Sequence, residues 1–79
     1  MPPKKIQTRE EVLAKFGSRL KKLREKKGLS GAELGRLVNM ERQNISRFEA
    51  GRANPSLVII KKICTALGIK VEEFFKGFK

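Results

Sequence analysis

The side chains best suited to specific recognition lie together between positions 42 and 47. They are Arg42, Gln43, Asn44, Ser46 and Arg47, in a stretch that reads NMERQNISRFEAG. Arginine, glutamine and asparagine each donate several hydrogen bonds in a fixed geometry. This pattern favours binding to a partner that presents an ordered set of hydrogen-bond acceptors.

The rest of the composition argues against catalysis. The chain has no histidine, one cysteine, and only glutamate among its eight acidic residues. Without histidine, neither a cysteine–histidine zinc site nor a serine–histidine or cysteine–histidine catalytic pair can form within the chain. We therefore expect a protein that is not an enzyme, with no cofactor, no metal site and no small-molecule ligand.

The charge is strongly positive: 19 basic residues against 8 acidic residues give a net charge of +11. Such a field attracts polyanions, whether nucleic acid, an anionic membrane surface or an acidic protein. Ten of the basic residues fall in residues 1–28, whereas residues 29–52 carry a net charge of only +1. The first segment can supply general attraction while the donor-rich stretch does something more selective.

A chain of 79 residues is one domain at most. We expect residues 1–8 to be a flexible basic tail and residues 9–79 to form the domain. The chain shows no signal peptide and no apolar run of transmembrane length, so we predict a cytoplasmic protein without a membrane partner. The single cysteine, Cys64, lies on an apolar stripe and is expected to be buried and inert.

Five helical segments are expected to position these side chains, at about 9–27, 31–38, 41–50, 55–67 and 70–78. Capping boxes of Thr8 with Glu11 and Ser30 with Glu33 begin the first two, and Asn54 is the expected cap of the fourth. The expected core residues repeat at helical spacing. They are Val12, Leu13, Phe16, Leu20, Leu23, Leu34, Leu37, Val38, Ile45, Phe48, Leu57, Ile60, Ile63, Cys64 and Leu67.

At three positions the residue type leads us to expect a particular feature of the backbone. Gly35 lies inside a helix, where glycine lowers stability, so a close neighbouring backbone is the expected reason for it. Gly17 is expected to weaken the first turns of the first helix. Asn39 ends the second helix and tolerates a left-handed backbone.

Two short helices joined by a few residues form a helix-turn-helix. In this geometry the second helix enters the major groove of double-stranded DNA with its first residues leading. Arginine pairs with guanine O6 and N7, and glutamine pairs with adenine N6 and N7. Arg42 and Gln43 would then lie at base edges, with Ser46 and Arg47 one turn later.

Residues 16–75 resemble the Cro/C1-type helix-turn-helix family, also called the XRE family, of bacterial and phage repressors. The matching segments are FGSRLKKLREKKGLS, AELGRLV, NISRFEAGRANPS and KKICTALGI. The resemblance implies an all-α, five-helix, lambda-repressor-like domain that binds operator DNA, usually as a symmetric dimer. The small size is similar to that of phage repressors and of controllers of restriction–modification systems, which implies a bacterial or phage protein associated with the nucleoid.

The resemblance also assigns roles by position. Arg42, Gln43 and Arg47 match base-contacting residues, and Arg24 with Glu49 matches a pair that ties the first helix to the recognition helix. Contacts with the DNA backbone are expected from Asn44, Ser46, Gly31, Arg52, Asn54 and Lys21. Apart from the resemblance, three aromatic residues are too many for the last helix to bury alone. One or two of them are expected to fill the core, and a leftover aromatic marks a dimer interface rather than a ligand pocket, so the expected dimer interface is drawn from Phe74, Phe75 and Phe78.

Three positions depart from the family pattern. Asn39 stands where the family more commonly has a turn glycine. Gly31 stands where glutamine usually contacts phosphate, which leaves only its backbone N–H for that contact. Glu41 stands where serine or threonine commonly caps the recognition helix. It could cap weakly, orient Arg42, or accept a hydrogen bond from cytosine N4 as a base contact.

The sequence therefore predicts a sequence-specific transcriptional regulator. As a homodimer it would insert helix 41–50 into a pseudo-palindromic operator, with recognition helices about 34 Å apart. One alternative is a protein-interaction module, such as an antitoxin or adaptor, that uses the same fold. A second is a non-specific nucleic-acid binder driven by net charge.

Overall fold

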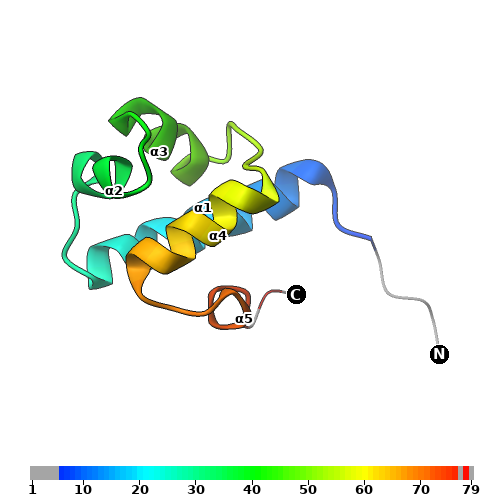
Figure 1. Ribbon diagram of the computed structural model, residues 1–79. Coiled ribbons are helices and arrows are strands. Elements are labelled where there is room, and N and C mark those ends of the chain that lie inside the picture. The colour runs from blue at the N-terminus through cyan, green and yellow to red at the C-terminus, as the bar shows by residue number, and fades with distance from the viewer. Residues whose placement is uncertain (1–5, 77, 79) are drawn as a thin grey trace.

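A computed structural model of the chain describes residues 6–76 and 78, and every regular element among these residues is a helix. The helices are α1 (Arg9–Lys26), α2 (Gly31–Leu37), α3 (Arg42–Glu49), α4 (Leu57–Leu67) and α5 (Val71–Phe74). Figure 1 shows α2 and α3 on one side of α1 and α4, with α5 on the other side. The prediction of an all-α, five-helix fold is confirmed.

One apolar core joins the five helical regions. Its buried members are Phe16, Leu20, Leu34, Val38, Ile45, Phe48, Ile63, Cys64, Leu67 and Phe74. Cys64 is fully buried, as expected, and burial raises the pKa of its thiol. The neutral thiol is the less reactive form, so this cysteine acts as a small apolar side chain.

Two of the leucines expected in the core lie on the surface. Leu37 is 60% exposed and Leu57 is 77% exposed. Leu34 and Val38 already face inward at the end of α2, and Leu37 lies between them on the outer side. Leu57 is the first residue of α4, and packing against the core begins further along this helix, at Ile59 and Ile60. The apolar pattern extends one turn beyond the part of α4 that neighbouring helices cover.

The starts of α1 and α2 are closed by the predicted capping boxes. The Thr8 hydroxyl accepts from the Glu11 N–H at 3.1 Å, and the Thr8 N–H donates to the Glu11 carboxylate at 2.9 Å. The predicted start of α4 is wrong, because Ser56 caps this helix instead of Asn54. The Ser56 hydroxyl accepts from the Ile59 N–H at 3.1 Å, which moves the start two residues later.

Two glycines mark places where a helix lies close to a neighbouring stretch of backbone. A Cβ at Gly35 would lie 2.5 Å from the Met40 carbonyl oxygen, so the expected close neighbour is present. A Cβ at Gly17 would collide with the carbonyl oxygens of Phe48 and Glu49. Gly17 was expected only to weaken α1, but it lets the backbone of α1 reach the end of α3. Asn39 adopts φ 59°, the left-handed conformation expected of it.

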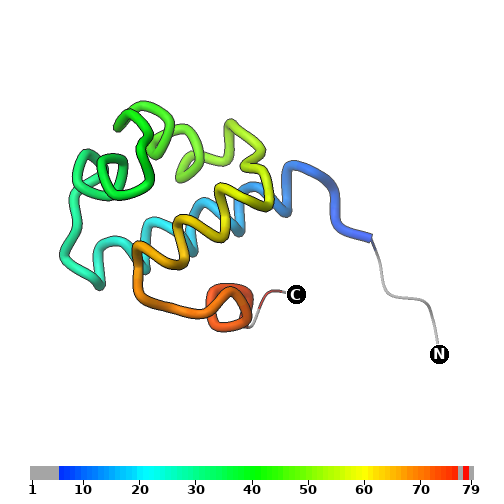
Figure 2. The backbone as a smooth tube through the Cα atoms, viewed as in Figure 1, coloured from blue at the N-terminus to red at the C-terminus, as the bar shows by residue number. Residues whose placement is uncertain are grey.

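The turn between α3 and α4 lies near the start of α1, as the chain trace in Figure 2 shows. Gly51, with φ +72°, packs against the backbone of α1, where an added Cβ would lie 3.3 Å from the Ala14 Cα.

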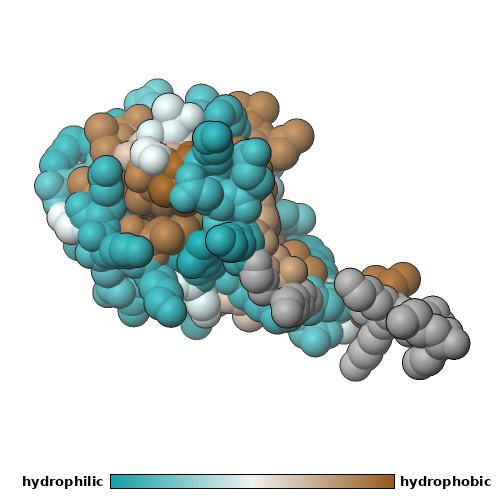
Figure 3. Space-filling view, turned by 90° about the horizontal axis from the view of Figure 1, so that it is seen from below, coloured by the Kyte–Doolittle hydropathy of each residue, from teal (hydrophilic) through white to brown (hydrophobic). Residues whose placement is uncertain are grey.

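The surface in Figure 3 is mostly hydrophilic, with hydrophobic side chains exposed in patches. The predicted flexible tail falls mainly on residues 1–5, which lie outside the described residues.

Candidate nucleic-acid interface

α3 has two different faces. Ile45 and Phe48 point into the core, with exposed fractions of 1% and 7%. Arg42, Gln43 and Arg47 are exposed on the opposite side. Because the inner residues lie three apart, they fix the rotation of the helix about its axis. The polar face is therefore turned outward by the packing of the apolar one.

The start of α3 carries no side-chain cap. Glu41 is the N-cap residue, with extended backbone, and its carboxylate makes no capping hydrogen bond. Its backbone carbonyl accepts from the Asn44 N–H at 3.0 Å, which begins the helix. N–H groups at a helix start carry partial positive charge and suit an anion. The exposed Glu41 side chain leaves this end of α3 open.

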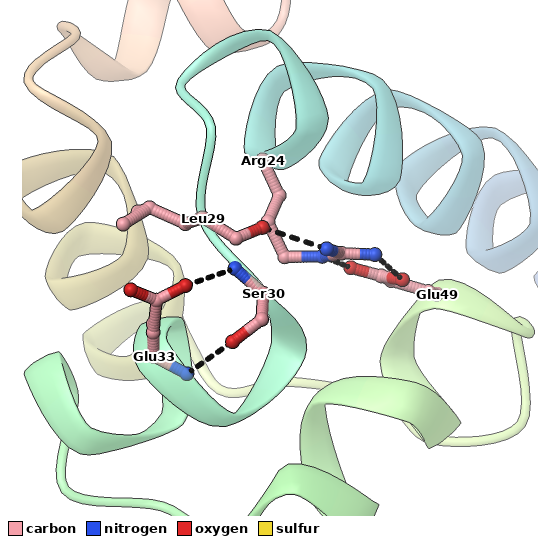
Figure 4. Close-up of polar contacts among 5 residues, drawn as sticks. All are labelled: Arg24, Leu29, Ser30, Glu33 and Glu49. Carbon is pink, nitrogen blue, oxygen red and sulfur yellow. Dashed lines mark hydrogen bonds and ion pairs between the residues drawn. The ribbon is translucent and has the colours of Figure 1, made fainter.

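The other end of α3 is held by Arg24 at the end of α1. The Arg24 Nε donates to Glu49 Oε2 at 2.6 Å, and its Nη2 donates to Glu49 Oε1 at 3.0 Å. A third donor, Nη1, reaches the Leu29 carbonyl oxygen at 2.8 Å. Figure 4 shows the arginine between the two partners. The hydrogen bonds to Glu49 raise the pKa of Arg24.

This ion pair is largely shielded from water, since the side chains of Arg24 and Glu49 are 14% and 11% exposed. A two-pronged arginine–carboxylate contact restricts direction as well as distance. Through Leu29, the same guanidinium also holds the segment before α2. The pair expected from the sequence is present, and it joins α1, the start of the helix-turn-helix and α3.

The start of α2 is closed by its own residues. The Glu33 N–H donates to the Ser30 hydroxyl at 3.0 Å, and the Ser30 N–H donates to Glu33 Oε1 at 2.8 Å (Figure 4). The hydrogen bond that the Ser30 N–H donates favours the ionised carboxyl group and lowers the pKa of Glu33. Gly31 follows the cap and lies beside α3, where an added Cβ would be 3.5 Å from Arg42 Cγ.

An open groove runs between the start of α2 and the outer face of α3. Its lining residues are Arg24, Gly31, Arg42, Gln43, Ile45, Ser46, Arg47 and Glu49. Half of the ten positions expected to meet DNA thus line one groove, together with the ion pair that orients α3. The other expected contacts lie outside its lining: Glu41 is exposed and Asn44 half-buried at the start of α3, Lys21 is exposed on α1, and Arg52 and Asn54 are exposed in the turn after α3.

The predicted aromatic dimer interface is wrong in one member. Phe74 has no exposed surface and stacks near Phe16, with ring centroids 5.1 Å apart, so it cannot reach a partner without leaving the core. Phe75 and Phe78 are half-buried, with ring centroids 4.9 Å apart. For these two, a role at an interface stays a prediction.

Sequence reasoning missed Arg19, which fastens α5 to α1. Its Nε donates to the Phe74 carbonyl oxygen, and its Nη2 donates to the Glu73 carbonyl oxygen, both at 2.9 Å. It belongs to the basic segment of residues 1–28, which was expected only to supply general attraction. The residue type itself could have indicated this role. The several donors of an arginine can satisfy the unpaired carbonyl groups at the end of a very short helix.

The described residues show neither a group of three or more potential metal-ligating side chains nor a helix suited to crossing a bilayer. The fold and the open polar face of α3 define a helix-turn-helix domain.

Comparison with known proteins gives the same class. A helix-turn-helix domain family matches residues 15–74, and the chain belongs to this family. The control protein C.MunI from Mycoplasma sp is 39% identical over 70 residues, which cover 87% of this chain and 95% of that protein. The SPbeta prophage-derived uncharacterized HTH-type transcriptional regulator YonR from Bacillus subtilis is 36% identical over 62 residues. That match covers 78% of this chain but only 57% of YonR.

Among solved structures, the fold is similar to that of the restriction-modification controller protein C.AhdI from Aeromonas hydrophila. The TM-score is 0.77 at 46% sequence identity, over 80% of this chain and 96% of that chain. The resemblance to XRE-type regulators, stated above from sequence motifs, is therefore confirmed. The family is one of regulators and is not a class of enzymes.

Proposed function

We propose that this protein is a transcriptional regulator that binds a pseudo-palindromic operator as a homodimer. Each chain inserts α3 into the major groove of double-stranded DNA, with its first residues leading. Arg42, Gln43 and Arg47 contact base edges. The observation that carries this proposal is the outward polar face of α3, which the core and the Arg24–Glu49 pair hold in one direction.

Contacts with phosphate surround the base contacts in this proposal. The residues proposed to make them are Asn44, Ser46, Gly31, Arg52, Asn54 and Lys21. Gly31 acts through its backbone N–H, since it has no side chain. The net charge of +11 adds attraction that does not depend on sequence and weakens as salt rises.

The controllers of restriction–modification systems are the class of regulator that we favour. The match spans 95% of C.MunI and 96% of C.AhdI, so almost the full length of two such controllers is represented here. An operator-binding regulator of this kind acts at the nucleoid, in the cytoplasm of a bacterium. It needs neither a cofactor nor catalytic residues, because occupying its site is sufficient for regulation.

Selection of bound sites from random DNA tests the proposal directly. The expected result is a palindromic consensus with half-sites about one helical turn apart. Recovery of sequences without any consensus would favour the charge-driven, non-specific binder. Absence of DNA binding at low salt would favour the protein-interaction module.

The variant Arg42→Ala tests whether α3 reads bases. We expect it to relax the consensus at one position in each half-site, at a cost of about 1–3 kcal/mol in discrimination, and to leave the fold intact. Arg36→Ala is the matched control, because Arg36 is an exposed arginine in the last turn of α2. The control loses the same charge, so its affinity should fall equally for all sequences. Identical selected sites for wild type and Arg42→Ala would contradict the assignment.

A further inference from the structure

A groove outside the candidate nucleic-acid interface carries more positive charge than the groove beside α3. It lies between α1 and the residues that follow α5, and its lining residues include Lys15, Arg19, Lys22, Lys76 and Phe78. Four of the described lining residues are basic and none is acidic, whereas three arginines and one glutamate line the groove beside α3. The proposed function assigns no specific role to this second concentration of positive charge.

This groove opens on the side of α1 that faces away from α3. Gly17 and Arg24 face the end of α3, and Lys15 and Lys22 each precede one of these residues by two positions. Two positions turn a helix by about 200°, so the two lysines lie on the opposite side of α1. Figure 1 shows α5 on the side of the molecule away from α2 and α3 as well. A molecule whose α3 lies in DNA would therefore leave this groove open to a second partner.

Arg19 holds part of the charge in a fixed place. Its Nε and Nη2 donate to the carbonyl oxygens of Phe74 and Glu73, which anchors the guanidinium between α1 and α5 at the wall of the groove. Two of the donors with which an arginine grips a phosphate are thus directed at backbone carbonyls instead. The exposed lysines, Lys22 and Lys76 among them, supply the remaining charge and can meet a carboxylate as readily as a phosphate.

Phe78 gives the same groove an apolar wall. It is half-buried, and its ring packs edge-on against that of Phe75, with centroids 4.9 Å apart. The backbone of a DNA duplex offers phosphates to the lysines but no apolar group to Phe78. A protein segment can offer both, because an acidic side chain and an apolar one can lie side by side. Positive charge beside an aromatic wall therefore fits an acidic protein segment better than a duplex.

One acidic residue limits how far such a segment extends along α1. Beyond Arg19 a second groove continues beside α1 and holds further lysines, but Glu73 also lines it. The carboxylate of Glu73 would repel an acidic partner at that end. The acids of the partner therefore lie between Lys15 and Lys22, which are two turns of α1 or about 10 Å apart. An extended segment of about three residues covers this distance.

We propose that this groove is a docking site for a short acidic segment of a second protein, with an apolar side chain among its acids. The carboxylates pair with Lys22 and Lys76, and the apolar side chain packs against Phe78. The site goes beyond the proposed function, because a regulator bound to its operator through α3 can hold this partner on its other side. It assigns Phe78 to a different partner and leaves Phe75 for a contact between two copies of the chain.

Titration of the full chain with a labelled synthetic peptide, followed by fluorescence anisotropy, tests the charge contacts. The peptide is a run of glutamates with a central leucine. The double variant Lys22→Gln, Lys76→Gln should bind it about tenfold more weakly, since each exposed ion pair contributes a few-fold. The matched control Lys61→Gln, Lys62→Gln removes two exposed lysines from α4 and should change the affinity by less than about twofold. Equal losses in the two double variants would overturn the proposal, because the peptide would then respond only to net charge.

A second peptide, with glutamine in place of the leucine, tests the apolar wall. Phe78→Ala should weaken binding of the leucine peptide about threefold or more and leave binding of the glutamine peptide unchanged. Because Phe78 also packs against Phe75, Phe78→Leu is the variant that keeps an apolar side chain there, and it should retain most of the affinity. Equal effects of Phe78→Ala on the two peptides would overturn the proposal. So would a change in self-association, measured by sedimentation, without any change in peptide affinity.

The place of binding separates this proposal from the proposed function. Amide NMR shifts on adding the leucine peptide should change mainly at residues 14–22, 76 and 78, and saturation with selected operator DNA should leave the peptide affinity unchanged. If a random-sequence duplex added to that complex displaces the peptide and shifts the same amides, the groove binds nucleic acid and the docking proposal is wrong. Failure to select any operator would reject the proposed function, whereas the peptide titrations of the free protein would still decide the docking site.

Discussion

α2 and α3 have almost the same length but are held at opposite ends. α2 is closed at its first turn, where Ser30 and Glu33 satisfy each other's polar groups. α3 is open at its first turn, where Glu41 makes no capping bond, and is held at its last turn by Arg24 through Glu49. The two helices therefore differ in how the N–H groups of their first turns are satisfied. In α2, the supporting helix, its own side chains cap the first turn. In α3, the helix proposed to recognise DNA, the first turn has no side-chain cap and can bind a partner.

Two contacts of different kinds attach the last turn of α3 to α1. Gly17 allows the backbone of α1 to meet the carbonyl oxygens of Phe48 and Glu49. The ion pair with Arg24 then fixes the side chain of Glu49, whose backbone carbonyl already lies against Gly17. Close backbone contact sets the distance between α1 and α3, and the directional ion pair sets the angle.

Filling the space at Gly17 is expected to lower the free energy of unfolding more than any other variant described below. In Gly17→Ala the new methyl group collides with two backbone carbonyls, which cannot move as a flexible side chain can. We expect the free energy of unfolding to fall by about 2–3 kcal/mol, despite the better helix propensity of alanine. Urea denaturation measures this loss, and DNA affinity should fall with it.

Gly31→Ala is the matched control at the start of α2. Its methyl group would lie 3.5 Å from Arg42 Cγ, an ordinary contact, so stability should change little. If Gly17→Ala and Gly31→Ala unfold at the same urea concentration, then α3 is not held by close backbone contact.

Weakening the ion pair should have the next largest effect. Glu49→Gln keeps the shape of the side chain but removes the charge that Arg24 meets in a largely buried setting. We expect a loss of about 1–2 kcal/mol in the free energy of unfolding. Because α3 then samples more angles, affinity should fall for all DNA sequences while the consensus stays the same.

Glu25→Gln serves as the control for this variant, since Glu25 is an exposed acid next to Arg24 in α1. It removes the same charge without touching α3. A change of consensus in Glu49→Gln would show that Glu49 acts on the base contacts themselves and not through the direction of the helix.

The comparison can also be tested by adding to α3 a side-chain N-cap like the one that α2 has. In Glu41→Ser a hydroxyl replaces the uncapped carboxylate at the N-cap position. We expect stability to rise by about 1 kcal/mol. DNA affinity should also rise for all sequences, since a negative charge leaves the phosphate side of the helix. A shift in consensus at one base would identify Glu41 as a reader of cytosine.

The comparison also shows which features the sequence could predict. The capping boxes at Thr8 and Ser30 were predictable, because they are local patterns of two side chains three residues apart. The Arg24–Glu49 pair was indicated by family resemblance and by Glu49 being the only acid late in its helix. The outward direction of Arg42 followed from the spacing of Ile45 and Phe48.

Features that depend on what covers a residue were not predictable in the same way. Periodicity assigned Leu37 and Leu57 to an inner face, but only the fold determines where a neighbouring helix ends. The role of Gly17 depends on a backbone 31 residues away in the sequence, at Phe48. The burial of Phe74 beside Phe16 likewise required the return of α5 to α1.

The smallest effect is expected from the cap of α2, and it depends on pH. Hydrogen bonds from Ser30 lower the pKa of Glu33, so the ionised carboxylate is favoured in the folded state. Its contribution to stability is therefore complete above the ordinary carboxyl pKa and is lost as the pH falls through the lower folded value. Below the ordinary carboxyl pKa of 4.5, the wild type should therefore lose this part of its stability, whereas Glu33→Gln has no carboxylate at this position to protonate.

Acidification also removes negative charge throughout the chain and leaves 19 basic residues to repel one another, which destabilises every variant. Glu25→Gln makes the same change of charge outside a capping box, so it isolates the effect of the cap. Thermal unfolding of wild type, Glu33→Gln and Glu25→Gln from neutral to acidic pH should show a reduced acid dependence for Glu33→Gln relative to Glu25→Gln. Parallel curves for these two variants would mean that α2 is not closed by its own residues, and the contrast between a closed α2 and an open α3 would fail.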